Sequence, residues 1–239
     1  MLNDNSFSYE KQEKSDIVRT LFDKIAPVYD LLNDIISLKQ HKRWKKEAIN
    51  IIDIKTGDKI LDLCCGSGDV SQLIMENSPD NIEIFAVDFS ESMIEKAHEK
   101  LQNFNNVKII CADAMSLPFE KESFDCIIIS FGFRNLENLS KSLLEMNRVL
   151  KPGGTMVILD FGKPEKYVFK VIFDIYFNTC VPIIGKIFNN YNEYAYLPAS
   201  IKIYPSPSSL IELISEAGFI NVSNKDCFFG FVSIQKGIK

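Results

Sequence analysis

The sequence has few of the features that mark a metal centre. Its six cysteines follow no metal-ligand spacing, and most of them lie in apolar runs that are typical of strands. A cysteine in such a run is usually a small buried hydrophobic side chain. We therefore expect no metal site from Cys64, Cys65, Cys111, Cys126, Cys180 and Cys227.

The sequence also lacks a basic excess, a signal peptide and a long apolar run. The net charge is −5, so no overall basic field attracts nucleic acid. The first residues are polar, unlike a signal peptide, and no stretch of about 20 residues is uninterruptedly apolar, which disfavours a transmembrane helix. Hydrophobic residues make up 46% and charged residues 25% of the 239 positions. This composition predicts a single soluble domain, residues 1–239, in the reducing cytoplasm.

Residues 59–88 contain the clearest structural signal. An apolar run leads into a glycine turn, Gly66-Ser67-Gly68, and a second apolar run farther on ends at Asp88. This order predicts strand, tight turn, helix and strand, a unit that binds ligands at the carboxyl ends of its strands. The glycines allow a ligand to approach the backbone. Asp88, 20 residues beyond Gly68, is placed to accept hydrogen bonds from ribose hydroxyls.

Two kinds of ligand fit such a unit, a dinucleotide and S-adenosylmethionine. A dinucleotide site needs a third glycine beside the pyrophosphate, and Ser71 holds that position here. Asp69 begins the helix instead, where an acid repels a pyrophosphate and suits a cationic ligand. Asp62 adds a second negative charge that can hold an ammonium group. The pattern therefore favours S-adenosylmethionine, the alternative being an ordinary turn with glycines for tightness.

The rest of the chain alternates between strand-like and helix-like segments. Five strands separated by helices predict an α/β fold with a mainly parallel, doubly wound sheet. Two further strands close this sheet, and we expect the last to be antiparallel. The expected strands are 59–64, 82–88, 107–111, 124–130, 155–160, 219–228 and 231–235, and the expected helices are 16–26, 69–77, one starting near residue 90, 136–150 and 207–217.

Three segments do not belong to this alternation. Residues 1–15 are expected to form a mobile tail. The basic stretch 39–46 is interpreted as a solvated helix face. Residues 163–202 are rich in aromatic and aliphatic side chains, but charged residues, proline and glycine interrupt them. We expect a packed helical insertion, an apolar lid over a site, or a surface that touches lipid.

Several longer stretches resemble one enzyme family. They are FDKIAPVYDLLND, ISLKQHKRWK, LDLCCGSGD, VDFSESMIEKA, GFRNLEN, LLEMNRVLKPGG, LDFGKP, YLPASIKIYP and GFVSIQKGIK. Through them the chain resembles the class I methyltransferases of menaquinone and ubiquinone biosynthesis, which methylate a ring carbon of a polyprenylated quinol. The resemblance implies the class I S-adenosylmethionine-dependent methyltransferase fold with a helical lid insertion. It also implies cofactor contacts from Ser67, Asp88, Asp113, Ala114 and Ser130, and the full set of candidate cofactor residues adds Asp62, Gly66, Gly68 and Phe89.

The chain departs from the family pattern at a few positions. Cys64-Cys65 stand where alanine and glycine are frequent, and Lys39 replaces a glycine before His41. Asp160 stands for a glutamate. The ribose acid and the Gly-Phe-Arg-Asn segment at 132–135 are intact, so the resemblance still implies catalysis.

The implied reaction is transfer of a methyl group from S-adenosylmethionine to carbon. Arg134, just past a strand end, can favour the phenolate form of a hydroquinone, or it can form a salt bridge to the following helix. Asn135 can position the hydroxyl group. A general base must also take a proton, and the sequence does not choose among His41, Asp160, Tyr194 and a water molecule.

Other functions stay open at this point. The chain can be a class I methyltransferase of a small soluble acceptor or a subunit that binds S-adenosylmethionine without catalysis, whereas the missing third glycine disfavours a nicotinamide dehydrogenase. The expected partners are a polyprenylated quinol and, transiently, the inner face of the cytoplasmic membrane. The sequence does not distinguish a naphthoquinol from a benzoquinol acceptor, or a monomer from a homodimer.

Overall fold

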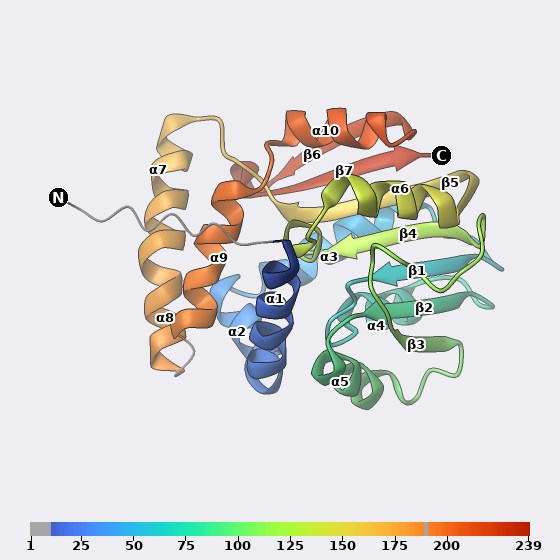
Figure 1. Cartoon of the computed structure of the whole chain (residues 1–239), viewed down its shortest axis with the longest axis horizontal. Helices are drawn as coiled ribbons and strands as arrows, with labels where there is room; N and C mark the ends of the chain where they lie inside the picture. Colours follow the sequence, from blue (N-terminus) through green and yellow to red (C-terminus); the bar gives the residue numbers. More distant parts are fainter. Residues whose placement is uncertain (1–10, 189–190) are drawn as a thin grey trace.

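A seven-stranded sheet is the centre of the computed structural model, which describes residues 11–188 and 191–239 (Figure 1). The strand order is β3-β2-β1-β4-β5-β7-β6. The strands are β1 (Lys59–Leu63), β2 (Glu83–Asp88), β3 (Val107–Cys111), β4 (Phe124–Ser130), β5 (Leu150–Phe161), β6 (Ile220–Cys227) and β7 (Val232–Ile238). Strands β1 to β5 pair in parallel, and β7 lies antiparallel between β5 and β6. The predicted α/β class and the antiparallel last strand are confirmed.

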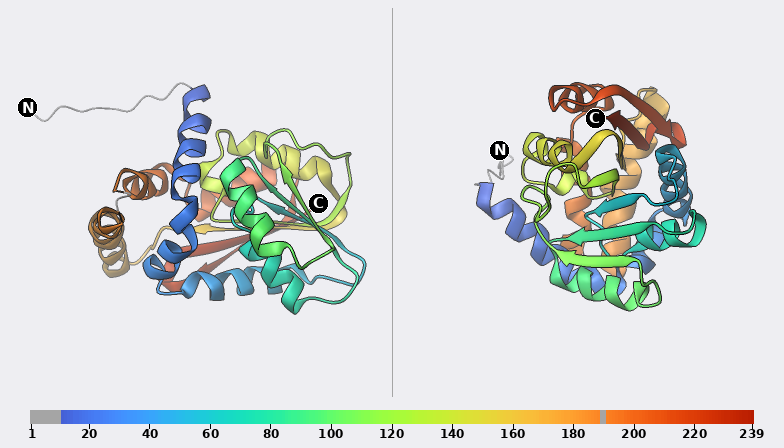
Figure 2. Two further views of the ribbon diagram at one scale, coloured as in Figure 1. Left: turned by 90° about the horizontal axis from the view of Figure 1, so that it is seen from below. Right: turned by 90° about the vertical axis from the view of Figure 1, so that its right-hand side faces the viewer.

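Helices cover both faces of this sheet (Figure 2). Ile60 and Ile128 pack against α3 and α4 on one face, whereas Leu61 and Ile127 pack against α6 and α10 on the other. Burial on both faces explains why these strands are continuous apolar runs in the sequence. The helices of the two layers are α3 (Gln40–Ile52), α4 (Asp69–Asn77), α5 (Glu91–Leu101), α6 (Leu139–Val149) and α10 (Pro207–Glu216).

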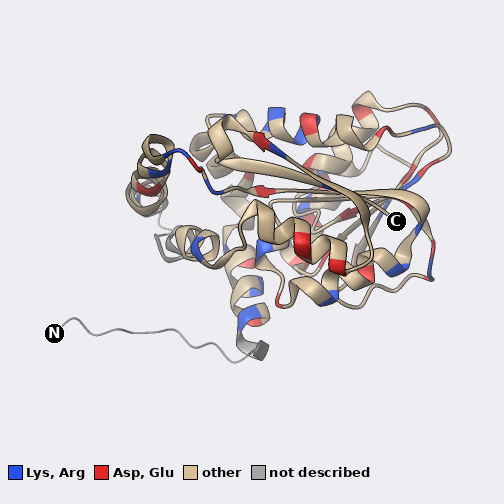
Figure 3. Ribbon diagram, turned by 90° about the horizontal axis from the view of Figure 1, so that it is seen from above, with Lys and Arg blue, Asp and Glu red and all other residues tan. Residues whose placement is uncertain are grey.

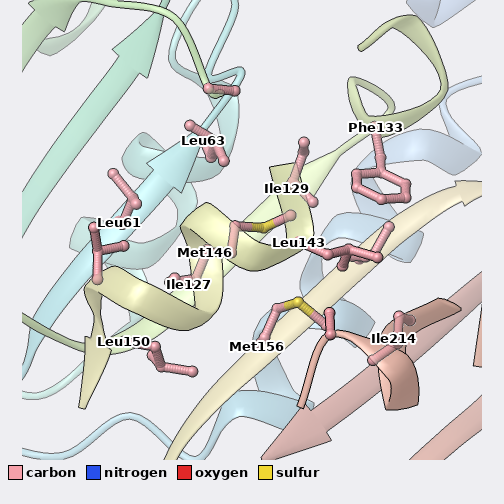
Figure 4. Packing of buried hydrophobic residues seen from close by; sticks show 14 of the residues in the cluster. Leu61, Leu63, Ile127, Ile129, Phe133, Leu143, Met146, Leu150, Met156 and Ile214 are labelled. Carbon is pink, nitrogen blue, oxygen red and sulfur yellow. The ribbon is translucent and has the colours of Figure 1, made fainter. Parts of the chain in front are cut away.

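The larger part of the core lies under α6. Leu143 and Met146 of this helix belong to one buried cluster with Leu61 and Ile129 of the sheet, and all four side chains are fully buried (Figure 4). Asn138 caps the helix, because its side chain accepts a hydrogen bond from the N–H of Lys141 at 2.9 Å. The helix therefore begins at Leu139 rather than at residue 136.

Two other predicted boundaries are wrong by a wider margin. Helix α1 begins at Lys11, so residues 11–15 of the expected tail are helical, and residues 1–10 lie outside the described chain. Strand β5 begins at Leu150 rather than at residue 155, so the Lys-Pro-Gly-Gly segment at 151–154 belongs to this strand. A Cβ atom on Gly154 would lie 2.8 Å from the carbonyl oxygen of Asp125, so this glycine permits close approach of β4.

The N-terminal helices and the 163–202 segment lie at the carboxyl ends of the parallel strands (Figures 1 and 2). They are α1 (Lys11–Ile25), α2 (Tyr29–Ile36), α7 (Tyr167–Ile175), α8 (Val181–Ile187) and α9 (Tyr191–Ile203), with a π-helical turn (Tyr176–Cys180) joining α7 to α8. Pro27 lies in a short 3₁₀ turn that ends α1. The expected helical insertion is therefore present in the described part of 163–202.

Helices α7 and α8 form one helix of 21 residues, Tyr167–Ile187. Its length and composition would allow it to cross a membrane, although the sequence contains no uninterrupted apolar run. Phe173, Phe177 and Val181 are buried against the rest of the protein, whereas Tyr167 and Ile187 are more than two-thirds exposed. The helix therefore packs through one face and presents an apolar second face.

Candidate active site

A cavity of about 370 Å³ opens at the carboxyl ends of β1, β2 and β4. This volume is within the range of about 300–1,000 Å³ that small-molecule sites occupy. Six of the nine candidate cofactor residues line it: Gly66, Asp88, Phe89, Asp113, Ala114 and Ser130. The sheet therefore brings together most of the residues that the sequence assigned to a cofactor.

Asp88 holds the glycine turn at the edge of this cavity. One carboxylate oxygen accepts a hydrogen bond from the N–H of Gly66 at 2.9 Å, and the other accepts from the N–H of Ser90 at 3.0 Å. Gly66 and Gly68 have φ angles of +55° and +86°, which only glycine adopts without strain. Burial raises the pKa of Asp88 above its ordinary value. Because a carboxylate has about four lone-pair positions, Asp88 can still accept a bond from a ligand.

The other three candidates, two in the turn itself and Asp62 in the strand before it, do not line the cavity. The Asp62 carboxylate accepts hydrogen bonds from the Ser71 N–H at 3.0 Å and the Ser71 hydroxyl at 2.7 Å, and burial raises its pKa to about 7. Ser67 donates to Asp30 at 2.6 Å. Gly68 packs against Leu101, since a Cβ on this glycine would lie 2.7 Å from a Leu101 methyl group. These residues fix the strand and the helix around the turn.

The role predicted for the charge of Asp69 is wrong. This carboxylate forms ion pairs with Lys45, at 2.8 Å, and with Lys100. Burial opposes its ionisation, but the two ammonium groups hold the pKa of Asp69 well below its usual range. Its charge is therefore compensated by the protein and is not reserved for a cationic ligand. Lys45 is correspondingly a buried residue of the basic stretch, not part of a solvated face.

Helix α1 forms one wall of the cavity, which the sequence did not indicate. Val18, Arg19 and Phe22 line the cavity. Arg19 donates a hydrogen bond to the carbonyl oxygen of Phe89 at 3.1 Å, and Lys14 donates to that of Leu136 at 2.8 Å. The helical spacing predicted the helix, but only the fold places it beside strand ends that lie far away in the sequence.

A second cavity of about 420 Å³ adjoins the first. The two share Phe22, Tyr29, Ser130 and Phe131 as lining residues. Its remaining walls are mostly aromatic and aliphatic and come largely from α2, α3, the α7–α9 group and the turn before β7. Tyr29 was missed in the sequence, although it lies in one of the family-like stretches. Burial raises its pKa to about 12, so its hydroxyl is protonated at neutral pH.

The catalytic candidates are divided between the two cavities. His41, Arg134 and Tyr194 line the second cavity, and Asn135 lines the first. The Tyr196 hydroxyl contacts the Asn135 side-chain oxygen at 3.3 Å. Asp160 lines neither cavity and is fully buried behind Arg134.

Arg134 forms a buried ion pair with Asp160. A guanidinium nitrogen lies 2.9 Å from one carboxylate oxygen, and the other oxygen accepts from the Arg134 backbone N–H at 3.0 Å. The guanidinium carbon lies 4.9 Å from the centre of the Phe161 ring. The salt-bridge partner is thus on β5 rather than on the following helix. Because this pair occupies its carboxylate, Asp160 is poorly placed to act as a base.

Unpartnered polar atoms surround the two cavities. Five buried side-chain atoms that belong to lining residues have no hydrogen-bond partner within the described chain: His41 Nδ1, Ser130 Oγ, Arg134 Nε, Asn135 Nδ2 and the Tyr194 hydroxyl. Buried polar groups are normally paired, so these atoms are available to a ligand or to water. No group of three or more His, Cys, Asp or Glu residues in positions 11–188 and 191–239 can hold a metal ion.

Comparison with known proteins identifies relatives over almost the whole chain. The model of the ubiE/COQ5 methyltransferase family matches residues 9–239. Demethylmenaquinone methyltransferase of Staphylococcus haemolyticus (strain JCSC1435) is 38% identical over 231 residues, which cover 96% of this chain and 97% of that protein. The enzyme of the same name from Staphylococcus aureus (strain JH9) is 41% identical over 223 residues, which cover 93% of this chain and 92% of that protein.

Solved structures with the same architecture are more distant in sequence. A SAM-dependent methyltransferase from Aquifex aeolicus superposes with a TM-score of 0.60 at 19% identity and covers 81% of this chain and 88% of its own. A possible histamine N-methyltransferase from Thermotoga maritima gives a TM-score of 0.65 at 17% identity, and the match covers 92% of this chain and 99% of that one. These likenesses establish the fold as that of S-adenosylmethionine-dependent methyltransferases.

Removing one member of the Arg134–Asp160 pair should destabilise the protein. Asp160→Ala leaves a buried guanidinium without its counter-ion, which typically costs about 3–5 kcal/mol. We expect the free energy of unfolding, measured by chemical denaturation, to fall by that order. Asp174→Ala, at an exposed position of α7, is the control and should leave it nearly unchanged. Equal stability of the two variants would contradict the role of this ion pair.

Proposed function

The chain belongs to the ubiE/COQ5 methyltransferase family, and on that premise we propose that it methylates a ring carbon of demethylmenaquinol. It is an S-adenosylmethionine-dependent methyltransferase of quinone biosynthesis. The observation that carries the proposal is the pair of adjoining cavities, one at the glycine turn and one apolar. Such a pair suits a nucleoside cofactor and a lipid-like acceptor whose reacting atoms must meet.

The first cavity suits S-adenosylmethionine. Asp88 is placed to accept hydrogen bonds from the ribose hydroxyls, and Asp113 and Ala114 lie at the next strand end along the sheet. Ser130 lies on the side that faces the second cavity and has a hydroxyl without a partner among the described residues. When bound there, S-adenosylmethionine supplies a methyl group that its sulfonium makes electrophilic.

The second cavity suits a quinol with its prenyl tail. Phe169, Ile172 and Phe177 provide apolar walls, and each methylene buried against such walls contributes about 0.8 kcal/mol. Arg134 and Tyr194 add polar groups on the same cavity. We place the ring beside these groups and the tail among the aromatic side chains, and residues 163–202 serve as the lid of this site.

Catalysis then depends on placement and on charge. The protein must align the ring carbon with the methyl group, which is catalysis by proximity and orientation. The unpartnered Nε of Arg134 can donate to a developing phenolate oxygen, and the cation favours that ionised form. Asn135 can hold the same oxygen or its neighbour through its unpartnered amide nitrogen.

The apolar surface of α7 and α8 supports contact with a membrane. Tyr167, Val168, Ile175 and Ile187 are exposed, and charged residues are sparse along the α7–α9 group (Figure 3). Phe229 is 64% exposed and also lines the apolar cavity. A lipid surface that covers these side chains would let a quinol pass from the membrane into the cavity.

Asp88→Ala should weaken the binding of S-adenosylmethionine. Loss of hydrogen bonds to a charged group costs about 1.5–3 kcal/mol, or roughly tenfold to 100-fold in dissociation constant. Titration calorimetry on folded protein measures the loss, and Asp80→Ala, in the exposed turn before β2, is the control. Unchanged affinity in Asp88→Ala would mean that this residue does not hold the ribose.

Only the reduced acceptor should be methylated. An oxidised quinone ring is electron-poor and has no hydroxyl to ionise, so its carbon is a poor nucleophile. Incubation with methyl-labelled S-adenosylmethionine and demethylmenaquinone should give labelled product only when a reductant is present. A parallel reaction with the benzoquinol precursor of ubiquinone determines whether the acceptor range is wider. Equal incorporation with and without reductant would overturn the carbon-nucleophile mechanism.

The protein should bind lipid vesicles through α7. Ile175→Glu places a charge on this apolar face and should reduce flotation with vesicles that contain anionic lipid. Leu144→Glu is a matched control, because Leu144 lies on α6 and is 58% exposed, as Ile175 is. If the unaltered protein does not float with any lipid composition, or if both variants lose flotation equally, the membrane contact is wrong.

A further inference from the structure

His41 lies at the tight corner between α2 and α3. Its Nε2 atom is 2.7 Å from a carboxylate oxygen of Asp34, and the other oxygen of Asp34 is 3.1 Å from the ammonium group of Lys42. The backbone N–H of His41 donates to the Ser37 hydroxyl at 3.3 Å. The imidazole is therefore held from the α2 side, and its side chain is only 6% exposed.

These contacts determine which ring nitrogen carries the proton. The hydrogen bond from His41, together with the ammonium group of Lys42, holds the pKa of Asp34 below its ordinary value, so Asp34 is a carboxylate and can only accept. Nε2 must then donate its N–H to Asp34, and Nδ1 carries the lone pair. Nδ1 is buried and has no hydrogen-bond partner among the described residues. His41 thus offers an unoccupied basic nitrogen at the wall of the apolar cavity.

The other candidate bases are less suitable. The carboxylate of Asp160 accepts bonds from Arg134 and from the Phe161 N–H at 2.8 Å. Burial raises the pKa of Tyr194 well above its ordinary value, so its phenol keeps its proton at neutral pH. Tyr29 is protonated for the same reason. Among these candidates, His41 is the one that combines a free lone pair with a basicity suited to neutral pH.

We propose that Nδ1 of His41 accepts the proton that the quinol releases during methylation, and that Asp34 is the positioning residue that holds the proton of the neutral ring on Nε2 and so leaves the lone pair on Nδ1. The inference rests on the proposed function, because it requires the quinol ring to occupy the apolar cavity.

Each turnover replaces one ring hydrogen with a methyl group and releases one proton. As Nδ1 takes the hydroxyl proton, the ring carbon forms a bond to the methyl carbon, and the electron pair of the carbon–sulfur bond stays on sulfur. The methylated ring carbon then loses its hydrogen as a proton, and the ring oxygen regains one, which restores the aromatic hydroquinone. The imidazolium gives up its proton from Nδ1, to the ring oxygen or to solvent, while the Nε2 proton stays on Asp34's hydrogen bond, so Nδ1 is free again for the next turnover.

The charges around His41 predict the pH dependence. Burial and Lys45 lower its pKa below 6.5, while Asp34 on α2 and Asp69 on α4 oppose this shift. Arg134 and Tyr194 face the same cavity from other elements. Because the neutral ring is the active form, kcat/KM should rise as the pH increases and then level off. The midpoint of this acid limb should lie below pH 6.5. Asp34→Asn removes a charge that raises this pKa, so the limb should move to lower pH.

The test compares His41→Gln with His98→Gln in methyl transfer to demethylmenaquinol. The amide of the introduced glutamine can still donate to Asp34 but has no basic nitrogen, so we expect kcat to fall about 100-fold or more, with S-adenosylmethionine affinity and melting temperature nearly unchanged. His98, the other of the two histidines, is exposed on α5, and its variant should behave as the unaltered protein. Normal turnover in folded His41→Gln overturns the inference.

Two further measurements do not depend on the folding of that variant. Nitrogen-15 spectra of the histidine-labelled protein, assigned with His98→Gln, should show His41 as the Nε2–H tautomer, and the Nδ1–H tautomer would overturn the inference. If the rise of kcat/KM with pH occurs at the same pH in Asp34→Asn as in the unaltered protein, the inference is also overturned. If the unaltered protein does not methylate demethylmenaquinol at all, the proposed function fails, whereas the tautomer remains separately measurable.

Discussion

The carboxylate of Asp88 joins the ends of the first two strands. By binding the N–H groups of Gly66 and Ser90 it fixes the glycine turn after β1 and the start of α5 after β2. The turn needs this anchor because Gly66 and Gly68 both have positive φ angles and do not form regular structure. The remaining lining residues of the first cavity are then placed by the register of the parallel strands. One hydrogen-bonded carboxylate therefore shapes the first cavity before any ligand is bound.

Ser130 and Phe131 line both cavities and form the seam between them. Phe131 has a strained backbone conformation. Phe131 has a φ angle of +57°, which is unfavourable for a side chain of this size. Its N–H donates to the Leu159 carbonyl at 2.7 Å, and its ring packs against Phe161 with centroids 5.3 Å apart. The next residue must be glycine, because a Cβ on Gly132 would lie 2.4 Å from that of Cys64. Strain of this kind persists where the surrounding packing requires it, and here it turns the chain between the first and the second cavity.

Much of the sheet could be predicted from the sequence, because strands buried on both faces appear as continuous apolar runs. Strands β3 and β4 have the predicted boundaries. The start of β5 could not be predicted, since its first residues contain proline and two glycines that normally mark a turn. Part of the lining of the first cavity could also be predicted, because Asp88 and Ser130 each end a strand whose boundary is visible in the sequence. The residues that pair in space could not be predicted, because nothing in the sequence pairs Asp69 with Lys45 and Lys100, or Arg134 with Asp160.

In the proposed reaction, the methyl donor and the quinol ring meet at the seam formed by Ser130 and Phe131. A crystal structure with S-adenosylhomocysteine and a reduced, short-tailed demethylmenaquinol tests this meeting point most directly. We predict that the nucleoside occupies the cavity beside Asp88, with its sulfur atom at the seam, and that the quinol ring lies in the apolar cavity with its unsubstituted carbon facing that sulfur. A ring bound outside the apolar cavity, or a sulfur atom directed away from Ser130 and Phe131, would contradict it.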